Sequence, residues 1–356
     1  MNSLSHSETD YYSRQLMLPE WGNHAQLKLK KAKVMVVGAG ALGCSVLQSL
    51  SRAGVGHIGI IDEDVIVTSN LQRQILFDIN DIGKNKAVCS SEKIKYINPN
   101  IELKTFIHRI NEDNALELIK NYDVVVDGTD NFETKYLLND ACVMLGKPMV
   151  YGAIDTYEGQ VSVFNTSDES PTYRCLFPQP PKHEERNNCA TIGVSPFLPQ
   201  IIGGLQATEV IKLITGIGEN ISGKLIIYHS LNTQFSVFQF CLNPDNKNPE
   251  KTDLKNKETS GTAIEGVTYE IMQNENLILI DVRDETEHEK YNLGGMNIPL
   301  YDLEEYLYKF EKADKICTYC ETSSKAKQAA IILSNTLGKR VYYLTTPLNA
   351  LRNSLK

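Results

Sequence analysis

Apolar runs that alternate with helical spacing indicate an α/β fold in this chain. Residues 34–37, 58–61 and 124–126 are almost entirely apolar, as expected for parallel strands that are buried on both faces. Apolar positions of helical period between these runs, at Leu47 and Leu50 for example, predict helices that connect the strands. The alternation predicts a doubly wound, mostly parallel α/β sheet. Further strands are expected at residues 101–107, 148–151, 159–165, 224–228 and 234–240, and a long helix at 199–214 in which Gly203 and Gly204 indicate close helix packing.

The turn after the first strand is rich in glycine. Gly38, Gly40 and Gly43 occur in the sequence GAGALG, within which a helix begins. Such glycines permit a tight bend, let a phosphate approach the main chain, and let the helix pack on the strand. The second strand ends at Asp62, and an acid about 20 residues after the glycines suits a ribose hydroxyl. The pattern predicts a nucleotide site, for which NAD is the default ligand.

Basic residues beyond Asp62 favour ATP over NAD. Arg73 lies in the segment SNLQRQ, and Lys86 follows it. Cleavage of a triphosphate requires cations that stabilise the developing charge, whereas hydride transfer from NAD does not. The alternative is a solvated basic loop without a catalytic role. Two cations after a nucleotide-binding turn therefore predict an ATP site.

Asp130 follows the buried strand at residues 124–126, in the turn GTDN. Ligands of open α/β sheets bind beside the carboxyl ends of the strands. A carboxylate at this point can hold Mg²⁺ or position a triphosphate. Thr, Asp and Asn are also good helix N-caps, which is the structural alternative. We expect Asp130 to act in catalysis, and one turn can serve both purposes.

Composition limits the classes of function. The chain has 356 residues, which is enough for two domains with separate cores. Its net charge of −8 disfavours nucleic acid as the main partner. No segment is long and apolar enough to cross a membrane and the N-terminus does not look like a signal peptide, so we expect a cytoplasmic protein. The eight cysteines are irregularly spaced, which indicates reduced thiols rather than a disulfide framework.

The charge pattern predicts two domains and a linker. Residues 245–261 contain eight charged residues among seventeen and no aromatic residue, which is too little apolar surface to fold alone. We therefore expect an ATP-binding domain at residues 1–244, a linker at 245–261 and a second α/β domain at 262–356. The polar residues 1–10 are expected to be frayed.

Several motifs together resemble a known family. Arg14-Gln15, GAGALG, Asp62, SNLQRQ, Lys86 and GTDN occur in the order found in the ThiF/MoeB/HesA family, over roughly residues 8–243. These are ubiquitin-activating-enzyme-like adenylyltransferases with a Rossmann-like sheet. The resemblance implies that the chain uses ATP and Mg²⁺ to adenylate the C-terminal Gly-Gly end of a small ubiquitin-like sulfur-carrier protein. The expected pathway is molybdopterin or thiamine biosynthesis, and tRNA thiolation or peptide modification are the alternatives.

The resemblance also implies roles for individual residues. Asp62 would hold the ribose, Asp130 would be the essential acid, and Arg14 would reach the ATP of the partner subunit in a homodimer. Cys189 matches the cysteine that in relatives accepts the activated carboxylate or joins a persulfide linkage, and the alternative is a buried inert thiol. The residues implied to bind ATP are Gly38, Gly40, Ala41, Gly43, Asp62, Asp64, Ser69, Asn70, Leu71, Gln72, Arg73, Gln74, Lys86, Asp130 and Asn131.

A zinc site that is common in the family is missing from this sequence. The family often carries two C-x-x-C pairs that bind a structural zinc ion. Here Thr172 and Cys175 stand where the first pair is expected, and residues 245–249 contain no cysteine where the second should lie. Cys241 lies upstream and is expected to be packed in a strand. We therefore expect no structural zinc.

Residues 263–356 resemble a single rhodanese domain. Rhodaneses carry sulfur as a cysteine persulfide in a loop of converging N–H groups, and Cys320 occupies that position after a strand that contains Cys317. The loop departs from the pattern, because Ser323 and Lys325 replace the usual Gly and Arg. Glu321 adds a negative charge that opposes a thiolate. An active sulfurtransferase, fed by a sulfur donor, and an inactive docking domain both remain open.

Two rivals to adenylation belong to other classes of protein. The first is an NAD-dependent oxidoreductase, against which Arg73 and Lys86 count. The second is a non-catalytic scaffold that binds a carrier protein, which predicts that Asp130→Ala leaves function intact.

Overall fold

The computed structural model divides the chain into two compact units, Met1–Lys255 and Asn256–Lys356. It describes residues 3–180, 193–246, 264–274, 277–300, 302–310, 313, 315–321, 323–337, 339–348 and 351–352. Most of the predicted linker lies outside these residues, so its bounds stay a prediction. The two units are described separately.

The N-terminal unit is built on an eight-stranded sheet with the strand order β3-β2-β1-β4-β5-β6-β7-β8. The strands from β3 to β5 are parallel, and those from β5 to β8 are antiparallel. The predicted doubly wound, mostly parallel sheet is therefore confirmed. The strands are β1 (Lys33–Val37), β2 (His57–Ile61), β3 (Glu102–Phe106), β4 (Val124–Asp127), β5 (Met149–Asp155), β6 (Glu158–Phe164), β7 (Lys224–His229) and β8 (Gln234–Gln239).

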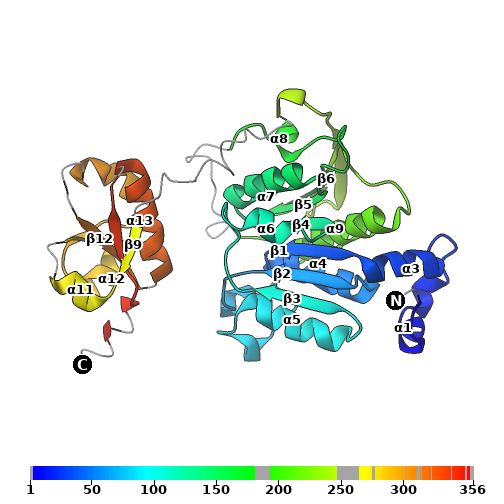
Figure 1. Cartoon of the computed structure of the whole chain (residues 1–356), viewed down its shortest axis with the longest axis horizontal. Coiled ribbons are helices and arrows are strands. Elements are labelled where there is room, and N and C mark those ends of the chain that lie inside the picture. The colour runs from blue at the N-terminus through cyan, green and yellow to red at the C-terminus, as the bar shows by residue number, and fades with distance from the viewer. Residues whose placement is uncertain are drawn as a thin grey trace. The chain divides into compact units, whose positions relative to one another are not determined.

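Helices cover both faces of this sheet (Figure 1). Alternate side chains of a strand point to opposite faces, so Val34 and Val36 join one core while Met35 and Val37 join the other. The first core contains residues of α3 (Gly22–Lys31), α4 (Ala41–Ala53), α5 (Lys86–Ile97) and α9 (Leu198–Thr215). The second contains residues of α6 (Ala115–Ile119), α7 (Phe132–Leu145) and α8 (Tyr173–Leu176).

The expectation that residues 1–10 are frayed is wrong for the described residues from Ser3 onward. They include α1 (His6–Tyr11), which is followed by α2 (Ser13–Leu16). Ser5 caps α1 by accepting from the backbone N–H of Glu8, while the Glu8 carboxylate accepts from Ser5 N and from Lys30 Nζ at 2.7 Å. Tyr12 is buried, and its hydroxyl accepts a hydrogen bond from Asn98 Nδ2 at 2.7 Å. The Ser5–Glu8 capping box was a local signal for this helix, whereas the contacts of Lys30 and Asn98 join segments far apart in the sequence.

The C-terminal unit has its own parallel sheet, with the strand order β11-β10-β12-β13-β9. Two clusters of buried apolar residues flank this sheet, so the unit has a core of its own. Its elements are β9 (Ile264–Val267), α11 (Tyr269–Asn274), β10 (Ile278–Asp281), α12 (Glu285–Lys290), β11 (Met296–Asn297), the 3₁₀ helix η5 (Leu303–Phe310), β12 (Ile316–Tyr319), α13 (Ser323–Leu337) and β13 (Val341–Leu344).

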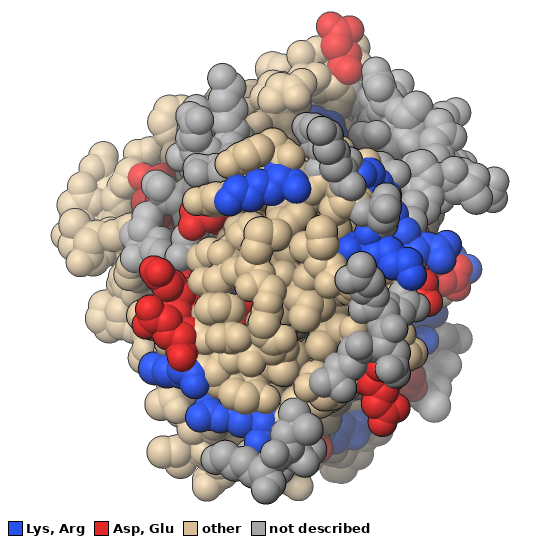
Figure 2. All heavy atoms as spheres, turned by 90° about the vertical axis from the view of Figure 1, so that its left-hand side faces the viewer, with Lys and Arg blue, Asp and Glu red and all other residues tan. Residues whose placement is uncertain are grey.

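The molecular surface shown in Figure 2 carries charges of both signs. Its described basic and acidic side chains form small separate groups around a broad area without charge. The described residues of this face therefore form no continuous basic surface of the kind that binds a phosphate backbone. Within the described residues, none of the helices combines the length and the apolar character that crossing a membrane requires.

Gly203 lies where α9 crosses α4. A Cβ atom at Gly203 would stand 2.6 Å from Ser45 Cβ and 3.0 Å from the carbonyl oxygen of Leu42. The next residue, Gly204, would have no heavy atom within 4 Å of its Cβ. The sequence expectation of close helix packing therefore applies to Gly203 and not to Gly204.

We predict opposite effects of alanine at these two neighbouring positions. Gly203→Ala should lower the free energy of unfolding by about 1–3 kcal/mol, because the added methyl group overpacks the helix crossing. Gly204→Ala should leave it unchanged or raise it by about 0.5–1 kcal/mol, because alanine loses less backbone entropy in a helix than glycine. Thermal unfolding followed by circular dichroism measures both, and equal destabilisation by the two variants would contradict the crossing.

Candidate active site

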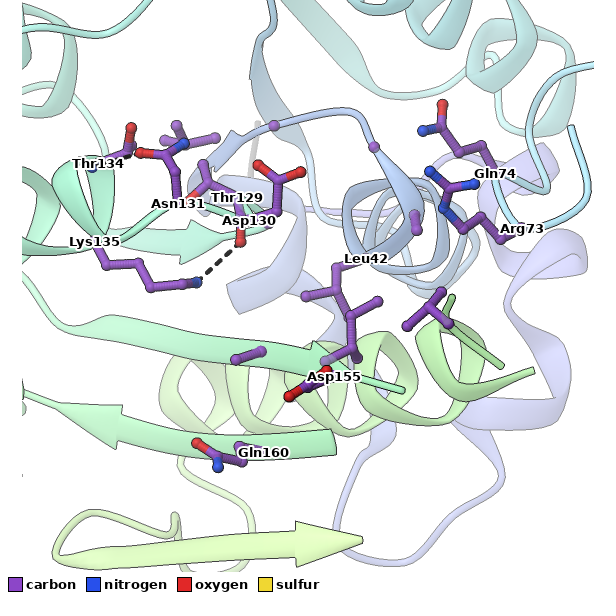
Figure 3. A pocket seen from close by; sticks show the side chains of 18 of the residues that line it. Leu42, Arg73, Gln74, Thr129, Asp130, Asn131, Thr134, Lys135, Asp155 and Gln160 are labelled. Atoms are coloured by element: carbon purple, nitrogen blue, oxygen red, sulfur yellow. Dashed lines mark hydrogen bonds between the residues drawn. The ribbon is translucent and has the colours of Figure 1, made fainter. Parts of the chain in front are cut away.

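A cavity of about 1580 Å³ opens at the carboxyl edge of the N-terminal sheet. Its walls come from the ends of β1, β2, β4 and β5 and from the segments that follow them. Figure 3 shows Thr129, Asp130 and Asn131 on one side and Arg73 and Gln74 on the other, with Leu42 between them. The residues expected to bind ATP that line this pocket are Gly38, Gly40, Ala41, Asp62, Asp64, Ser69, Asn70, Gln72, Arg73, Gln74, Lys86, Asp130 and Asn131.

The glycine loop is shaped by close contact with its own helix and with the turn after β4. Gly38 has a φ of +91°, a conformation that L side chains rarely adopt. A Cβ atom at Gly43 would stand 1.9 Å from the carbonyl oxygen of Gly38. Gly43 is not among the residues that line the pocket, so its lack of a side chain serves the packing of α4 on the loop. Gly38 and Gly40 themselves face the pocket.

Asp62 ties the end of β2 to the glycine loop. Its Oδ2 accepts from the backbone N–H of Ala39 at 2.7 Å, and its Oδ1 accepts from that of Asp64 at 2.9 Å. Burial raises the pKa of the Asp62 carboxyl above its usual value, against the opposing effects of Lys86 and the two backbone donors. The carboxylate is therefore held in place at the pocket wall before any ligand is bound.

The segment from Ser69 to Gln74 follows a short 3₁₀ helix, η1 (Thr68–Asn70). Arg73 Nη1 donates to the carbonyl oxygen of Ser69 at 2.8 Å, so its guanidinium is held beside the pocket with donors to spare. Gln74 is buried and also faces the pocket. Leu71 does not line the pocket and packs against the apolar core instead. The expectation that Leu71 contacts ATP through its side chain finds no support in this arrangement.

Lys86 stands at the first position of α5 and is buried at the pocket wall. Its Nζ lies 2.8 Å from Asp64 Oδ2. No sequence pattern indicated this pairing, because the two residues are more than twenty positions apart. Asp64 therefore already partly neutralises the charge of Lys86. A phosphate that enters the pocket would share this ammonium group with the Asp64 carboxylate.

Two charged side chains that the sequence did not reveal, one at the end of β4 and one on α7, hold the turn between these elements. Asp127 is fully buried, and its Oδ1 accepts from Thr129 N at 3.0 Å and from Thr129 Oγ1 at 2.7 Å. Lys135 reaches back from α7 and donates to Asp127 Oδ2 at 2.8 Å. One sequence signal could have indicated this pair. Asp127 ends an apolar strand that is expected to be buried, and a buried carboxylate requires a partner. The lysine on the next helix was that partner.

Asp130 and Asn131 divide the two roles that the sequence left open for this turn. Asn131 is the N-cap of α7, because its Oδ1 accepts from the backbone N–H of Thr134 at 2.9 Å. Asp130 is exposed at the pocket wall, and none of the described residues donates a hydrogen bond to its carboxylate. The N-cap alternative therefore belongs to the neighbouring residue, and Asp130 is available to a ligand.

The far wall of the pocket was also missed by sequence reasoning. It is formed where β5, β6 and β7 meet, and Asp155, Glu158, Gln160 and His229 line it. His229 Nδ1 lies 3.3 Å from Glu158 Oε2 on the neighbouring strand. Figure 3 shows Asp155 and Gln160 on the adjacent strands below Asp130. No motif in the sequence marks these residues, because antiparallel pairing alone brings them to the pocket.

Comparison with known families bears on both units. Residues 12–251 match the ThiF family, and residues 267–353 match the rhodanese-like domain. The chain belongs to the ThiF family. The family resemblance inferred from the motifs is therefore confirmed.

Two relatives and one solved structure illustrate the match of this ThiF-family chain. It is 44% identical over 241 residues to a sulfur carrier protein adenylyltransferase of Thermus thermophilus, covering 67% of this chain and 89% of the relative. It is 37% identical over 351 residues to a probable adenylyltransferase/sulfurtransferase MoeZ of Mycobacterium tuberculosis, covering 92% and 88%. A crystal structure of E. coli MccB with AMPCPP and MccA is similar over 67% of this chain and 73% of that chain, with a TM-score of 0.59 and 25% identity.

Three of the family's expected catalytic residues lie apart from this pocket or outside the described residues. Arg14 is exposed on α2 and does not line the pocket of its own chain. Cys189 lies outside the residues that the structure describes. Cys320 belongs to the C-terminal unit.

The family's zinc position is occupied by hydrogen bonds in this chain. Cys175 Sγ accepts from the backbone N–H groups of Thr172 and Asn243, each at 3.4 Å, and Thr172 Oγ1 donates to the carbonyl oxygen of Asn246 at 3.3 Å. These contacts link the two segments that zinc would otherwise join. Among the residues described, no group of three or more His, Cys, Asp or Glu side chains is placed to hold a metal ion. Cys241 is exposed beyond the end of β8, so the expectation that it is packed in a strand is wrong.

Both cysteines of the rhodanese-like unit are buried. Cys317 lies in β12, and Cys320 directly follows that strand. Cys320 is 3% exposed and belongs to an apolar cluster. Cys317 is fully buried, and burial raises its pKa to about 12, as expected for a core thiol. Glu321 lies 3.3 Å from the guanidinium of Arg283, which also pairs with the buried Asp281 at 2.6 Å. One cation therefore faces two carboxylates next to Cys320.

Proposed function

We propose that the protein uses ATP to adenylate the C-terminal glycine carboxylate of a small ubiquitin-like sulfur-carrier protein. The observation that carries the proposal is the pocket itself, in which the glycine loop, Asp62, Arg73, Lys86 and the unpartnered Asp130 meet. The relatives named as adenylyltransferases of sulfur carriers support the same activity. The rival oxidoreductase has no use for Arg73 and Lys86 in this position.

The proposed reaction exchanges one bond to phosphorus for another. A carboxylate oxygen of the carrier attacks the α-phosphorus of ATP, and the bond from that phosphorus to the α–β bridging oxygen breaks. Pyrophosphate leaves with the bonding electrons, and an acyl-adenylate remains. The negative charge that develops on the phosphates is stabilised by Arg73 and Lys86, while Asp62 orients the ribose.

Asp130 suits a magnesium ion that arrives with ATP. Mg²⁺ is bound in such sites by one or two carboxylates together with phosphate oxygens. An exposed carboxylate to which no described residue donates a hydrogen bond, beside Asn131, meets that requirement. When bound, the ion would neutralise phosphate charge. Asp130 would hold it at the end of β4.

The identity of the carrier and its pathway is a further proposal, which rests on the names of the relatives. We propose molybdopterin or thiamine biosynthesis, and a relative from Porphyra purpurea that is named a probable molybdopterin-synthase adenylyltransferase supports the first. A carrier for tRNA thiolation is an alternative, and the MccB structure with MccA points to a peptide as another acceptor. The described cysteines form no disulfides, which supports a cytoplasmic location.

Carrier-dependent ATP–pyrophosphate exchange tests the reaction. Asp130→Ala and Arg73→Ala should each lower the exchange rate by about 10²–10³-fold, because each removes a group that meets developing phosphate charge. Lys120→Met, at an exposed surface pair with Glu117, is the matched control and should keep the full rate. Exchange that persists in Asp130→Ala or Arg73→Ala would refute the role assigned to that residue. A wild-type protein without carrier-dependent exchange would instead favour a scaffold that binds a carrier without catalysis.

We further propose that the enzyme is a homodimer in which Arg14 completes the partner subunit's site. Arg14 is exposed, and within the described residues its side chain has no hydrogen-bond or ion-pair partner. The segment that carries it is nevertheless firmly held. Tyr12 is buried beside it, and Gln15 Nε2 donates to the carbonyl oxygen of Ala53 at 2.9 Å. A fixed segment that presents an unpaired cation outward suits a role across a two-fold interface.

Hybrid dimers test whether Arg14 acts in the site of its own subunit or in that of the partner subunit. Subunits with Arg14→Ala and subunits with Asp130→Ala should each be inactive alone. A hybrid of the two, purified through different tags, should regain about half of the wild-type rate, because one of its two sites is then intact. If Arg14 serves its own subunit, both sites of the hybrid carry a defect and no activity returns.

The second candidate function is sulfur transfer through Cys320, which the name of the MoeZ relative suggests. Cys320 directly follows β12, the place at which rhodaneses carry their persulfide cysteine. In the proposed step the thiolate attacks the sulfane sulfur of thiosulfate, a cysteine persulfide forms and sulfite leaves. The burial of Cys320 means that its loop must open for this step.

Mass spectrometry after incubation with thiosulfate decides between transfer and docking. We predict a mass gain of one sulfur atom in the wild type and in Cys317→Ser, and none in Cys320→Ser. If the wild-type chain gains no sulfur and no sulfite is detected, the result would contradict sulfur transfer and favour a docking role for the domain.

A further inference from the structure

Lys135 is a buried lysine at the wall of the pocket, and its contacts converge on the turn before Asp130. Its Nζ donates to Asp127 Oδ2 at 2.8 Å and to the carbonyl oxygens of Thr129 and Gly152, each at 2.9 Å. An ammonium group has three protons, so these bonds use every donor that Lys135 has. The residue is 4% exposed, which leaves it no free face toward solvent.

The bond to Thr129 fixes the peptide group that leads into Asp130. The carbonyl of Thr129 and the amide of Asp130 belong to one rigid plane, so holding the first also orients the second. The other side of Thr129 is held as well, because its N–H and hydroxyl both donate to Asp127 Oδ1. Figure 3 shows Lys135 reaching Thr129 behind the carboxylate of Asp130.

Asp130 depends on this backbone support. None of the described residues donates a hydrogen bond to its carboxylate, so no side-chain contact determines where it points. The bond from Lys135 to Gly152 also fastens the turn to β5, whose end forms the far wall of the pocket. Tyr151 packs against the lysine from the same strand, with Nζ 5.0 Å from the ring centre. The turn is therefore held from β4, from β5 and from α7.

We propose that Lys135 is a positioning residue for the adenylation step, which sets Asp130 through the backbone of Thr129 without contacting the substrate. The role rests on the proposed function of the pocket. A positioning role differs from that of a purely structural ion pair. If Lys135 positions Asp130, its loss lowers the catalytic rate only while Asp130 is present.

Carrier-dependent ATP–pyrophosphate exchange with four variants tests this role. Lys135→Met should lower kcat by about 100-fold, the loss expected when a catalytic group is displaced by roughly 1 Å, with a much smaller change in the KM for ATP. The double variant Lys135→Met/Asp130→Ala should be no slower than Asp130→Ala alone, since both changes remove the same contribution. Lys135→Arg keeps the charge and the donors and should recover part of kcat. Lys120→Met should equal the wild type.

Three outcomes would overturn the positioning role. They are additive losses in the double variant, a raised KM with an unchanged kcat, and an unfolding midpoint that falls while kcat stays at the wild-type value. If Lys135→Met does not fold, Thr129→Val removes only the hydroxyl bond to Asp127 and should show a smaller kcat loss that is again absent beside Asp130→Ala. A wild-type protein without carrier-dependent exchange would instead overturn the proposed function, which separates the two failures.

Discussion

The loops after β1 and β4 touch backbone to backbone, and the pocket depends on that contact. A Cβ atom at Gly38 would stand 2.8 Å from the carbonyl oxygen of Gly128, and one at Gly128 would stand 2.9 Å from that of Gly38. Real Cβ atoms do not approach so closely, so both loops require glycine at this point. Their contact brings the glycine turn after β1 and Asp130 to one cavity. Neighbouring parallel strands supply this arrangement, because their carboxyl ends meet at the same edge.

Two lysines at this edge are paired with carboxylates before a substrate arrives. Lys86 is paired with Asp64, and Lys135 is paired with Asp127 beneath the turn. A buried cation without a partner would have a large desolvation penalty, so such pairing lets the pocket keep its cations in a stable fold. Arg73, in contrast to these lysines, is held by a hydrogen bond to the carbonyl oxygen of Ser69. The pocket therefore combines fixed pairs that shape its walls with a guanidinium and a carboxylate that are ready for a ligand.

The sequence predicted those parts of the structure that local patterns encode. Apolar runs located the central strands, and the glycine turn with Asp62 located the nucleotide pocket, because spacing along the chain determines both. The partnership of Lys135 with Asp127 was missed, since a buried lysine looks like a surface lysine in a single sequence. The ordered helix at His6–Tyr11 was missed for a similar reason, because Lys30 stabilises it from a distant position. Contacts between remote polar residues carry no periodicity from which they could be inferred.

The loss of the family's zinc cysteines shows how the same fold can be held in another way. A zinc site would link the segments around Thr172 and Asn243 by coordination of four thiolates. Here the thiol of Cys175 accepts two backbone N–H groups, and the hydroxyl of Thr172 crosses to Asn246. Hydrogen bonds of this kind are individually worth only about 1 kcal/mol, far less than a structural metal. The link can be this weak because β7 and β8, which lead to the second segment, are already fixed in the sheet by their own ladder. Strand pairing therefore stabilises this end of the unit, and the absence of a structural zinc ion stays a prediction.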